Sequence, residues 1–171
     1  MKNSIITYCF QFAILVLLQV LVANRILLWD FITPFISLFF IVSLPVSLDK
    51  WIQILACFLF GLCIDFFENS GGANAAACLV AIYAKPMFIR LFYQGEENLR
   101  DLYLTKDKPL QLFGILLSII VCHHLVVFSF EFYDFSFWNS ILKYTFWNSI
   151  FTFVVLVLCI AIFRNKPRYI Q

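Results

Sequence analysis

The sequence predicts an all-α integral membrane protein, a bundle of six transmembrane helices that forms a single domain. Hydrophobic residues make up 63% of the 171 residues, charged residues only 13%, and the mean hydropathy is +0.93. A water-soluble domain is about half apolar, and a spanning helix needs about 20 mostly apolar residues. We expect the spans at residues 5–23, 33–48, 51–67, 72–92, 109–130 and 145–163.

The first two stretches differ in length and in their helix breakers. We interpret residues 5–23 as a membrane helix, because the run is long enough to span and lacks the small-residue cleavage site of a signal peptide. Gln19 is expected to hydrogen bond a neighbouring helix, with a substrate contact as the alternative. In 33–48, Pro34 suits the first turn of a helix and Pro45 should stop or bend it. This stretch is a short, kinked span or a partly re-entrant one.

The third and fourth stretches are joined by a short turn with Gly71 and Gly72, so they must form an antiparallel hairpin. Cys57, Gly61 and Asp65 follow one another at four-residue spacing and therefore share one helix face. The fourth stretch is also rich in small residues, among them Ala73, Asn74, Ala75, Ala76, Ala77, Cys78 and Ala81. Small residues let two helix backbones approach closely, so the sequence predicts a tight helix pair.

Asp65 is the one acidic residue inside an apolar run, which makes it a candidate functional residue. The chain shows no nucleophile and base pair, no HExxH motif, no phosphate-binding glycine loop and no second embedded carboxylate near it. We therefore interpret Asp65 as architectural and expect no enzymatic activity, cofactor or metal. The six cysteines lie in apolar segments without paired spacing, as small packed hydrophobes do.

Lys85 and Pro86 follow in the fourth stretch. Pro86 predicts a kink or an end of the helix at Ala84, with the next turns at the membrane interface. A salt bridge between Asp65 and Lys85 is not expected. Asp65 lies near the turn, whereas Lys85 is about 20 Å further along the next helix.

The second half contains two patterns whose role the sequence leaves open. His123 and His124 point about 100° apart on a helix, so they are poorly placed to hold one metal; a buried histidine with a local hydrogen bond is favoured over a proton relay. The run FWNSI occurs at 137–141 and again at 146–150, on opposite faces of a continuous helix. Its aromatic residues favour anchors at the membrane surface, with 137–144 partly at that surface. Residues 94–108 read as a polar loop with a short helix over 96–103.

Basic residues set the predicted orientation. With six spans, nine of them fall on the side of both termini: Lys2, Lys50, Arg90, Arg100, Lys106, Lys108, Arg164, Lys166 and Arg168. Only Arg25 and Lys143 fall on the other side. The positive-inside rule then places both termini in the cytoplasm and Asp65 near the outer face. The basic residues form no stripe of the kind that binds nucleic acid.

Two classes of function remain. One is a scaffold that holds other membrane proteins through its small-residue faces and outer turns. The other is a small-molecule-binding component of a transporter, with Gln19, Asp65 and Asn74 lining a pocket. The scarcity of convergent polar side chains favours the scaffold.

A set of short motifs carries a family resemblance over about residues 10 to 95. The motifs are Leu17-Leu18-Gln19, Thr33-Pro34, Leu44-Pro45, Gly61-Leu62 with Asp65, Gly72 with Ala75, and Lys85-Pro86. In order and spacing they resemble the rod shape-determining membrane protein MreD. Family members usually carry Arg at the position of Lys85, which retains the charge but not the planar, bidentate donor.

The resemblance implies a non-enzymatic scaffold of the bacterial cell-wall elongation machinery in the inner membrane, where it binds MreC. Through MreC it implies indirect links to MreB, to the SEDS glycosyltransferase and to its penicillin-binding transpeptidase. It also implies a fold like that of the S component of energy-coupling-factor transporters. The alternative function is therefore the S component of a vitamin transporter.

Overall fold

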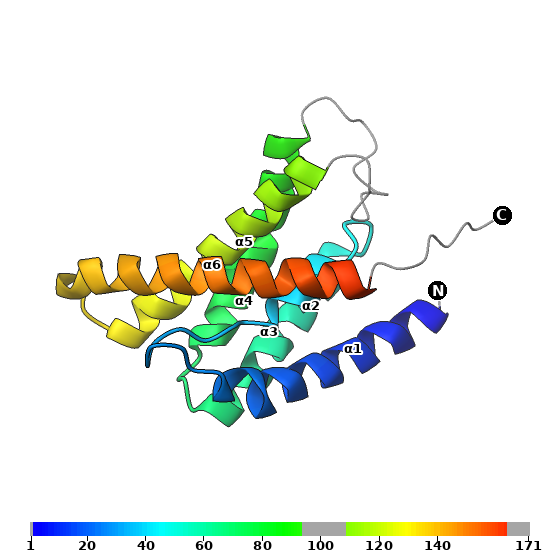
Figure 1. The fold of residues 1–171 in the computed structure, drawn as a ribbon. Coiled ribbons are helices and arrows are strands. Elements are labelled where there is room, and N and C mark those ends of the chain that lie inside the picture. Colours follow the sequence, from blue (N-terminus) through cyan, green and yellow to red (C-terminus); the bar gives the residue numbers. More distant parts are fainter. Residues whose placement is uncertain (1, 94–108, 164–171) are drawn as a thin grey trace.

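The computed structural model describes residues 2–93 and 109–163, and in these residues the protein is all-helical (Figure 1). The elements are α1 (Lys2–Leu21), η1 (Ala23–Arg25), α2 (Leu38–Ser43), α3 (Lys50–Glu68), α4 (Ala73–Phe92), α5 (Pro109–Phe132), η3 (Phe135–Phe137) and α6 (Trp138–Phe163). Five helices, α1 and α3 to α6, are long and apolar enough to cross a membrane, as in a multi-pass membrane protein. The loop, short helix and basic tail expected at 94–108 and 164–168 lie outside the described residues.

The bundle has two ends that differ in what they contain. The α3–α4 turn, the end of α1 and the α5–α6 connection lie together at the lower left of Figure 1, and we call this the hairpin end. Asn24, just after α1, donates to Glu68 at the end of α3 over 2.6 Å, which brings these helix ends side by side. The start of α1 and the end of α6 lie at the opposite, terminal end.

The second span does not form the helix predicted over 33–48; only the six residues of α2 are helical. Gln19 accepts from Ser37 N and Gln11 donates to Ser43 Oγ, so this part of the chain runs antiparallel to α1 from the hairpin end to the terminal end. We call residues 26–49 the irregular crossing. Its direction is that of a span, but most of its backbone is not helical.

The two prolines explain why α2 is so short. Pro34 does not open a helix, because α2 begins only at Leu38. A residue before proline is pushed toward extended backbone, and Leu44 has ψ 127° directly before Pro45. The prediction that Pro45 stops the helix is confirmed, whereas the prediction that Pro34 starts it is wrong.

Two further boundaries differ from the sequence prediction. The sequence predicted a kink or an end of the helix at Ala84; α4 continues through Pro86 to Phe92, so it does not end there. α6 begins at Trp138, so the helix starts before the span predicted from residue 145. On this helix Asn139 is exposed and Asn148 is buried, which confirms that the two copies of the repeat face opposite ways.

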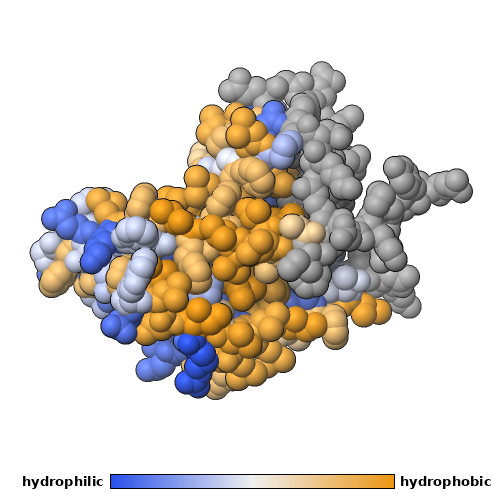
Figure 2. All heavy atoms as spheres, in the orientation of Figure 1, coloured by the Kyte–Doolittle hydropathy of each residue, from blue (hydrophilic) through white to orange (hydrophobic). Residues whose placement is uncertain are grey.

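The surface of the bundle is apolar along the helices. Figure 2 shows hydrophobic residues over the flank that it presents, with hydrophilic residues gathered at the hairpin end. Large side chains such as Trp51, Phe66 and Leu110 are more than three-quarters exposed. In a protein of this hydropathy, such side chains face lipid rather than water.

The α5–α6 connection is closed by a local carboxylate contact. Asp134 accepts from Ser136 N over 2.8 Å, and this bond lowers the pKa of the exposed Asp134 carboxyl. Tyr133 beside it has a positive φ of 50°. The connection is therefore a tight turn that returns the chain directly into α6.

Candidate functional site

The α3–α4 hairpin is closely packed at Gly61. A Cβ at this position would lie 2.5 Å from Ala75 Cα and 2.7 Å from Asn74 O, closer than real Cβ atoms approach backbone. The two helices also bury several small residues, namely Cys57, Ala73, Ala75, Ala77 and Ala81. The predicted tight helix pair is confirmed.

The turn of the hairpin needs residues that tolerate left-handed backbone. Asn69, Gly71 and Gly72 have φ of 54°, 62° and 94°. Glycine adopts this region without a Cβ penalty, and asparagine tolerates it better than most residues. These three residues let only four residues separate the end of α3 from the start of α4.

The carboxylate of Asp65 caps the first turn of α4 from the last turn of α3. Its Oδ1 accepts from Asn74 N over 2.9 Å and its Oδ2 from Ala75 N over 2.8 Å, and Ser70 Oγ also donates to it. Gly72, at the N-cap position, has no side chain that could accept these bonds. An anion at a helix N-terminus also interacts favourably with the helix dipole.

A chain of hydrogen bonds leads from Asp65 to α1, and we call it the hairpin-end network. Asn74 Nδ2 donates to Asp65 and to Glu68 Oε2, over 3.2 and 3.1 Å. Asn24 donates to the other oxygen of Glu68 and accepts from Gln19 Nε2 over 2.8 Å. The network therefore joins α1, α3 and α4 at the hairpin end.

The irregular crossing is held by side chains from the surrounding helices. Backbone that is not helical is tolerated at membrane depth only where the protein satisfies its N–H and C=O groups. The side-chain partners are Gln19 for Pro34 O and Ser37 N, Asn148 for Phe31 O and Thr33 N, Thr152 for Phe35 N, Gln53 for Pro45 O and Leu48 O, and Lys85 for the end of α2. Thus α1, α3, α4 and α6 all donate to or accept from this one segment.

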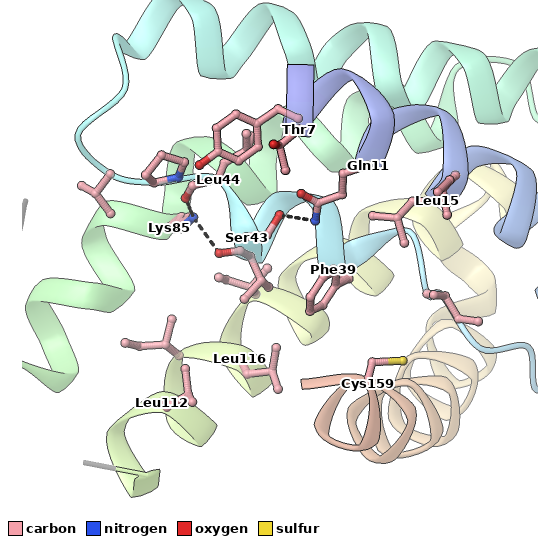
Figure 3. Close-up of a pocket in the computed structure, with 18 of the residues that line it drawn as sticks. Thr7, Gln11, Leu15, Phe39, Ser43, Leu44, Lys85, Leu112, Leu116 and Cys159 are labelled. Atoms are coloured by element: carbon pink, nitrogen blue, oxygen red, sulfur yellow. Dashed lines mark hydrogen bonds between the residues drawn. The ribbon is translucent and has the colours of Figure 1, made fainter. Parts of the chain in front are cut away.

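Lys85 is buried, with 5% of its surface exposed, and its ammonium group points at the C-terminal end of α2 (Figure 3). Nζ donates to the carbonyl oxygens of Ile41, Val42 and Leu44 over 2.9, 3.2 and 2.6 Å. Pro45 has no N–H, so Ile41 O cannot receive the usual backbone bond from four residues ahead. An ammonium has three donors, and three carbonyls receive them.

His124 supports the crossing indirectly. Its Nδ1 lies 2.8 Å from Ile120 O, so this nitrogen carries the proton. Its Nε2 lies 3.4 Å from Thr152 Oγ1, which accepts from Phe35 N over 3.1 Å. The expected local hydrogen bond is confirmed for His124. His123 is also buried, and its Nδ1 has no hydrogen-bond partner among the described residues.

Two cavities lie beside these contacts. The first, of about 590 Å³, is mostly apolar and lies between α1, α2 and α5; Leu15, Phe39 and Leu116 line it (Figure 3). The second, of about 540 Å³, lies at the hairpin end, and we call it the hairpin-end cavity. Its lining is Val20, Asn24, Arg25, Phe31, Thr33, Phe35, Phe67, Glu68, Phe128, Glu131, Tyr144 and Asn148.

The structure divides the residues singled out from the sequence into two groups. Cys57, Gly61, Asp65, Gly71, Gly72, Asn74, Ala75 and Ala77 belong to the hairpin, and Gln19, Pro34, Pro45 and Lys85 to the irregular crossing. Gln19, Asp65 and Asn74 are joined by the hairpin-end network, but none of them lines either cavity. Pro86 stands inside α4 and lines a smaller cavity of about 270 Å³.

Sequence reasoning missed several polar residues that act in these contacts, namely Asn24, Gln53, Glu68, Asn148 and Thr152. The sequence pattern that could have identified them is a polar side chain within or at the end of an apolar stretch, the same pattern that identifies Gln19. For Asn148 it was obscured by the repeat, in which an exposed asparagine stands at the matching position.

Comparison of the chain with protein-family models, curated proteins and solved structures finds no match to any of them. The inference of function therefore starts from the residues and contacts described above.

Proposed function

We propose that this protein is a non-enzymatic membrane scaffold of the bacterial cell-wall elongation machinery and contributes to rod shape by binding MreC. In this proposal MreC links it to MreB, the SEDS glycosyltransferase and the penicillin-binding transpeptidase. The protein lies in the inner membrane with the hairpin end toward the periplasm and both termini in the cytoplasm.

The observation that carries a scaffold role is the use made of the buried polar side chains. Gln19, Lys85 and Asn148 are almost fully buried, and each forms hydrogen bonds with backbone atoms of the irregular crossing. Asp65 likewise accepts from the backbone of α4. These groups stabilise one conformation of the bundle, which is what a protein that presents fixed surfaces to partners requires.

The motifs that resemble MreD also fall at the points that hold this conformation. Gly61 lets α3 pack directly against the backbone of Ala75 in α4. Lys85 donates to the carbonyl oxygen of Leu44, directly before Pro45, at the end of α2. A shared architecture would account for the order and spacing of these motifs along the chain.

The distribution of basic residues supports the proposed orientation. Lys2, Lys50 and Arg90 lie toward the terminal ends of α1, α3 and α4, whereas Arg25 and Lys143 lie toward the hairpin end. Cytoplasmic loops carry more Lys and Arg than outer loops do.

Affinity capture tests the proposal. The tagged protein is extracted from rod-shaped cells in mild detergent, and we expect MreC to be recovered with it. Depletion of the protein should round the cells. Gly61→Leu should reduce recovery of MreC, because its side chain separates α3 from α4. Leu62→Ala, on the exposed face one residue along, is the matched control.

A second candidate is the S component of a vitamin transporter, which the hairpin-end cavity favours because it mixes polar and aromatic walls. Recovery of ATPase and coupling subunits in place of MreC would contradict the scaffold and support this function.

A further inference from the structure

The hairpin-end cavity brings together side chains from distant parts of the chain. Asn24 and Arg25 come from η1, Glu68 from the end of α3, and Glu131 from the last turn of α5. Tyr144 comes from the first turns of α6. The cavity is large enough for a ligand group of about the size of an aromatic side chain, and it lies at the polar end of an otherwise apolar bundle (Figure 2).

Two carboxylates line this cavity. Glu68 accepts one amide bond on each oxygen, from Asn24 and Asn74. Glu131 is exposed and forms no hydrogen bond or ion pair with any residue in the described part of the chain. A carboxylate offers about four acceptor positions, so both groups retain capacity for a further donor.

Aromatic rings form much of the remaining wall, namely those of Phe31, Phe35, Phe67, Phe128 and Tyr144. The face of an aromatic ring attracts a cation within about 6 Å of its centroid. One ring of the wall already shows this contact, because Lys143 Nζ lies 4.9 Å from the centroid of Phe31. Carboxylates and aromatic rings together form the surroundings that organic cations prefer.

The charge of the whole hairpin end also favours a cationic ligand. Its described residues include five carboxylates and two basic side chains, namely Asp30, Asp65, Glu68, Glu131 and Asp134 against Arg25 and Lys143. Arg25 lines the cavity but is exposed and pairs with neither glutamate within 4.0 Å. An excess of one sign of charge around a cavity raises the local concentration of the opposite ion.

We propose that the hairpin-end cavity binds one organic cationic group, an ammonium or a guanidinium, between Glu68, Glu131 and the aromatic wall. The group belongs to a free amine or to a basic side chain of a protein partner. The site does not depend on the proposed scaffold function.

The first test is a calorimetric titration with benzylamine, which is cationic at neutral pH, of the protein in phosphatidylcholine nanodiscs. The heat of titrating empty nanodiscs is the blank. Benzoate, of similar shape and opposite charge, is the comparison ligand. We expect saturable binding of benzylamine only. Glu131→Gln should weaken it about fivefold to tenfold, the effect of one charge-assisted hydrogen bond.

Asp30→Asn is the matched control. It also removes one negative charge from the hairpin end, but Asp30 does not line the cavity. Its φ of 65° suits asparagine, so the backbone should be undisturbed. We expect less than a twofold change in affinity. Phe67→Leu, which removes one exposed ring from the wall, should weaken binding about threefold.

Three results would overturn the site: no saturable binding of benzylamine, equal binding of benzoate, or equal effects of Glu131→Gln and Asp30→Asn. Circular dichroism during heating checks that the variants fold as the wild type does. Glu131 forms no hydrogen bond or ion pair that a loss of charge would break, and the loss relieves its repulsion from Glu68, so the melting temperature of Glu131→Gln should not fall below that of the wild type.

The second test identifies the source of the cation, using the complex captured from cells. If a partner supplies a basic side chain, Glu131→Gln lowers recovery of that partner and benzylamine displaces it, whereas Asp30→Asn does neither. If the ligand is a free amine, recovery is the same for both variants. Failure of the wild-type protein to capture MreC would contradict the scaffold function and leave the titration unaffected.

Discussion

Replacement of Lys85 by methionine tests whether the ammonium group holds the irregular crossing. The change leaves three buried carbonyl oxygens, those of Ile41, Val42 and Leu44, without their donor. Each orphaned acceptor costs about 1–3 kcal/mol, which sets an upper bound of about 9 kcal/mol. Methionine also removes the cost of burying a charge, which is several kcal/mol. We expect a net loss of about 2–5 kcal/mol in the free energy of unfolding.

Unfolding in mixed micelles with increasing SDS, followed by tryptophan fluorescence and circular dichroism, measures this loss. Lys50→Met is the control, because Lys50 is exposed and its ammonium lies 5.2 Å from the centroid of Tyr83; the expected cost is about 1 kcal/mol or less. Lys85→Arg keeps the charge in a planar, longer group, so its loss in the free energy of unfolding should lie between the losses of Lys85→Met and Lys50→Met. A Lys85→Met variant as stable as Lys50→Met would refute the assignment.

Three further substitutions test the hairpin and the crossing by the same unfolding measurement. Gly61→Ala should cost about 1–3 kcal/mol, since its Cβ must push backbone atoms of α4 away; wild-type stability would show that the helices separate freely. In Asp65→Asn only one of the two terminal side-chain atoms can accept a hydrogen bond, so the change should cost about 1–3 kcal/mol by leaving one N–H of α4 unpaired. Asn148→Leu should cost about 2–4 kcal/mol, because Phe31 O and Thr33 N lose their partner. Asn139→Leu, at the matching position of the repeat, should be neutral, since Asn139 is exposed. Equal effects of the two substitutions would contradict the helix faces assigned to them.

The five long helices could be predicted because each is a continuous apolar stretch of sufficient length. The segment 33–48 is equally apolar, and hydropathy does not distinguish a helix from irregular backbone that is buried in protein. What decides between them is the supply of hydrogen-bond partners. Those of Thr33 and Phe35 come from residues 115 and 117 positions away, which no local pattern reveals.

The hairpin was predictable for the opposite reason, since its contacts are local. The spacing of Gly61 and Asp65 places both on one face of α3, and a short turn leaves α4 no other partner so close. Lys85 was noticed for its charge, but its contact with α2 spans more than 40 residues. Pro86 shows the limit of a local rule, because the surrounding bundle keeps α4 helical through it.

The irregular crossing can complete its hydrogen bonds only after later parts of the chain have been synthesised and inserted. When residues 31–44 leave the ribosome, neither Lys85 nor Asn148 has been made, and a segment with unpaired backbone groups is costly in lipid. The first three spans therefore cannot reach their final arrangement alone. The bundle is completed only when α4 and then α6 arrive, so truncation before α6 should leave a chain that membrane quality control recognises as unfinished.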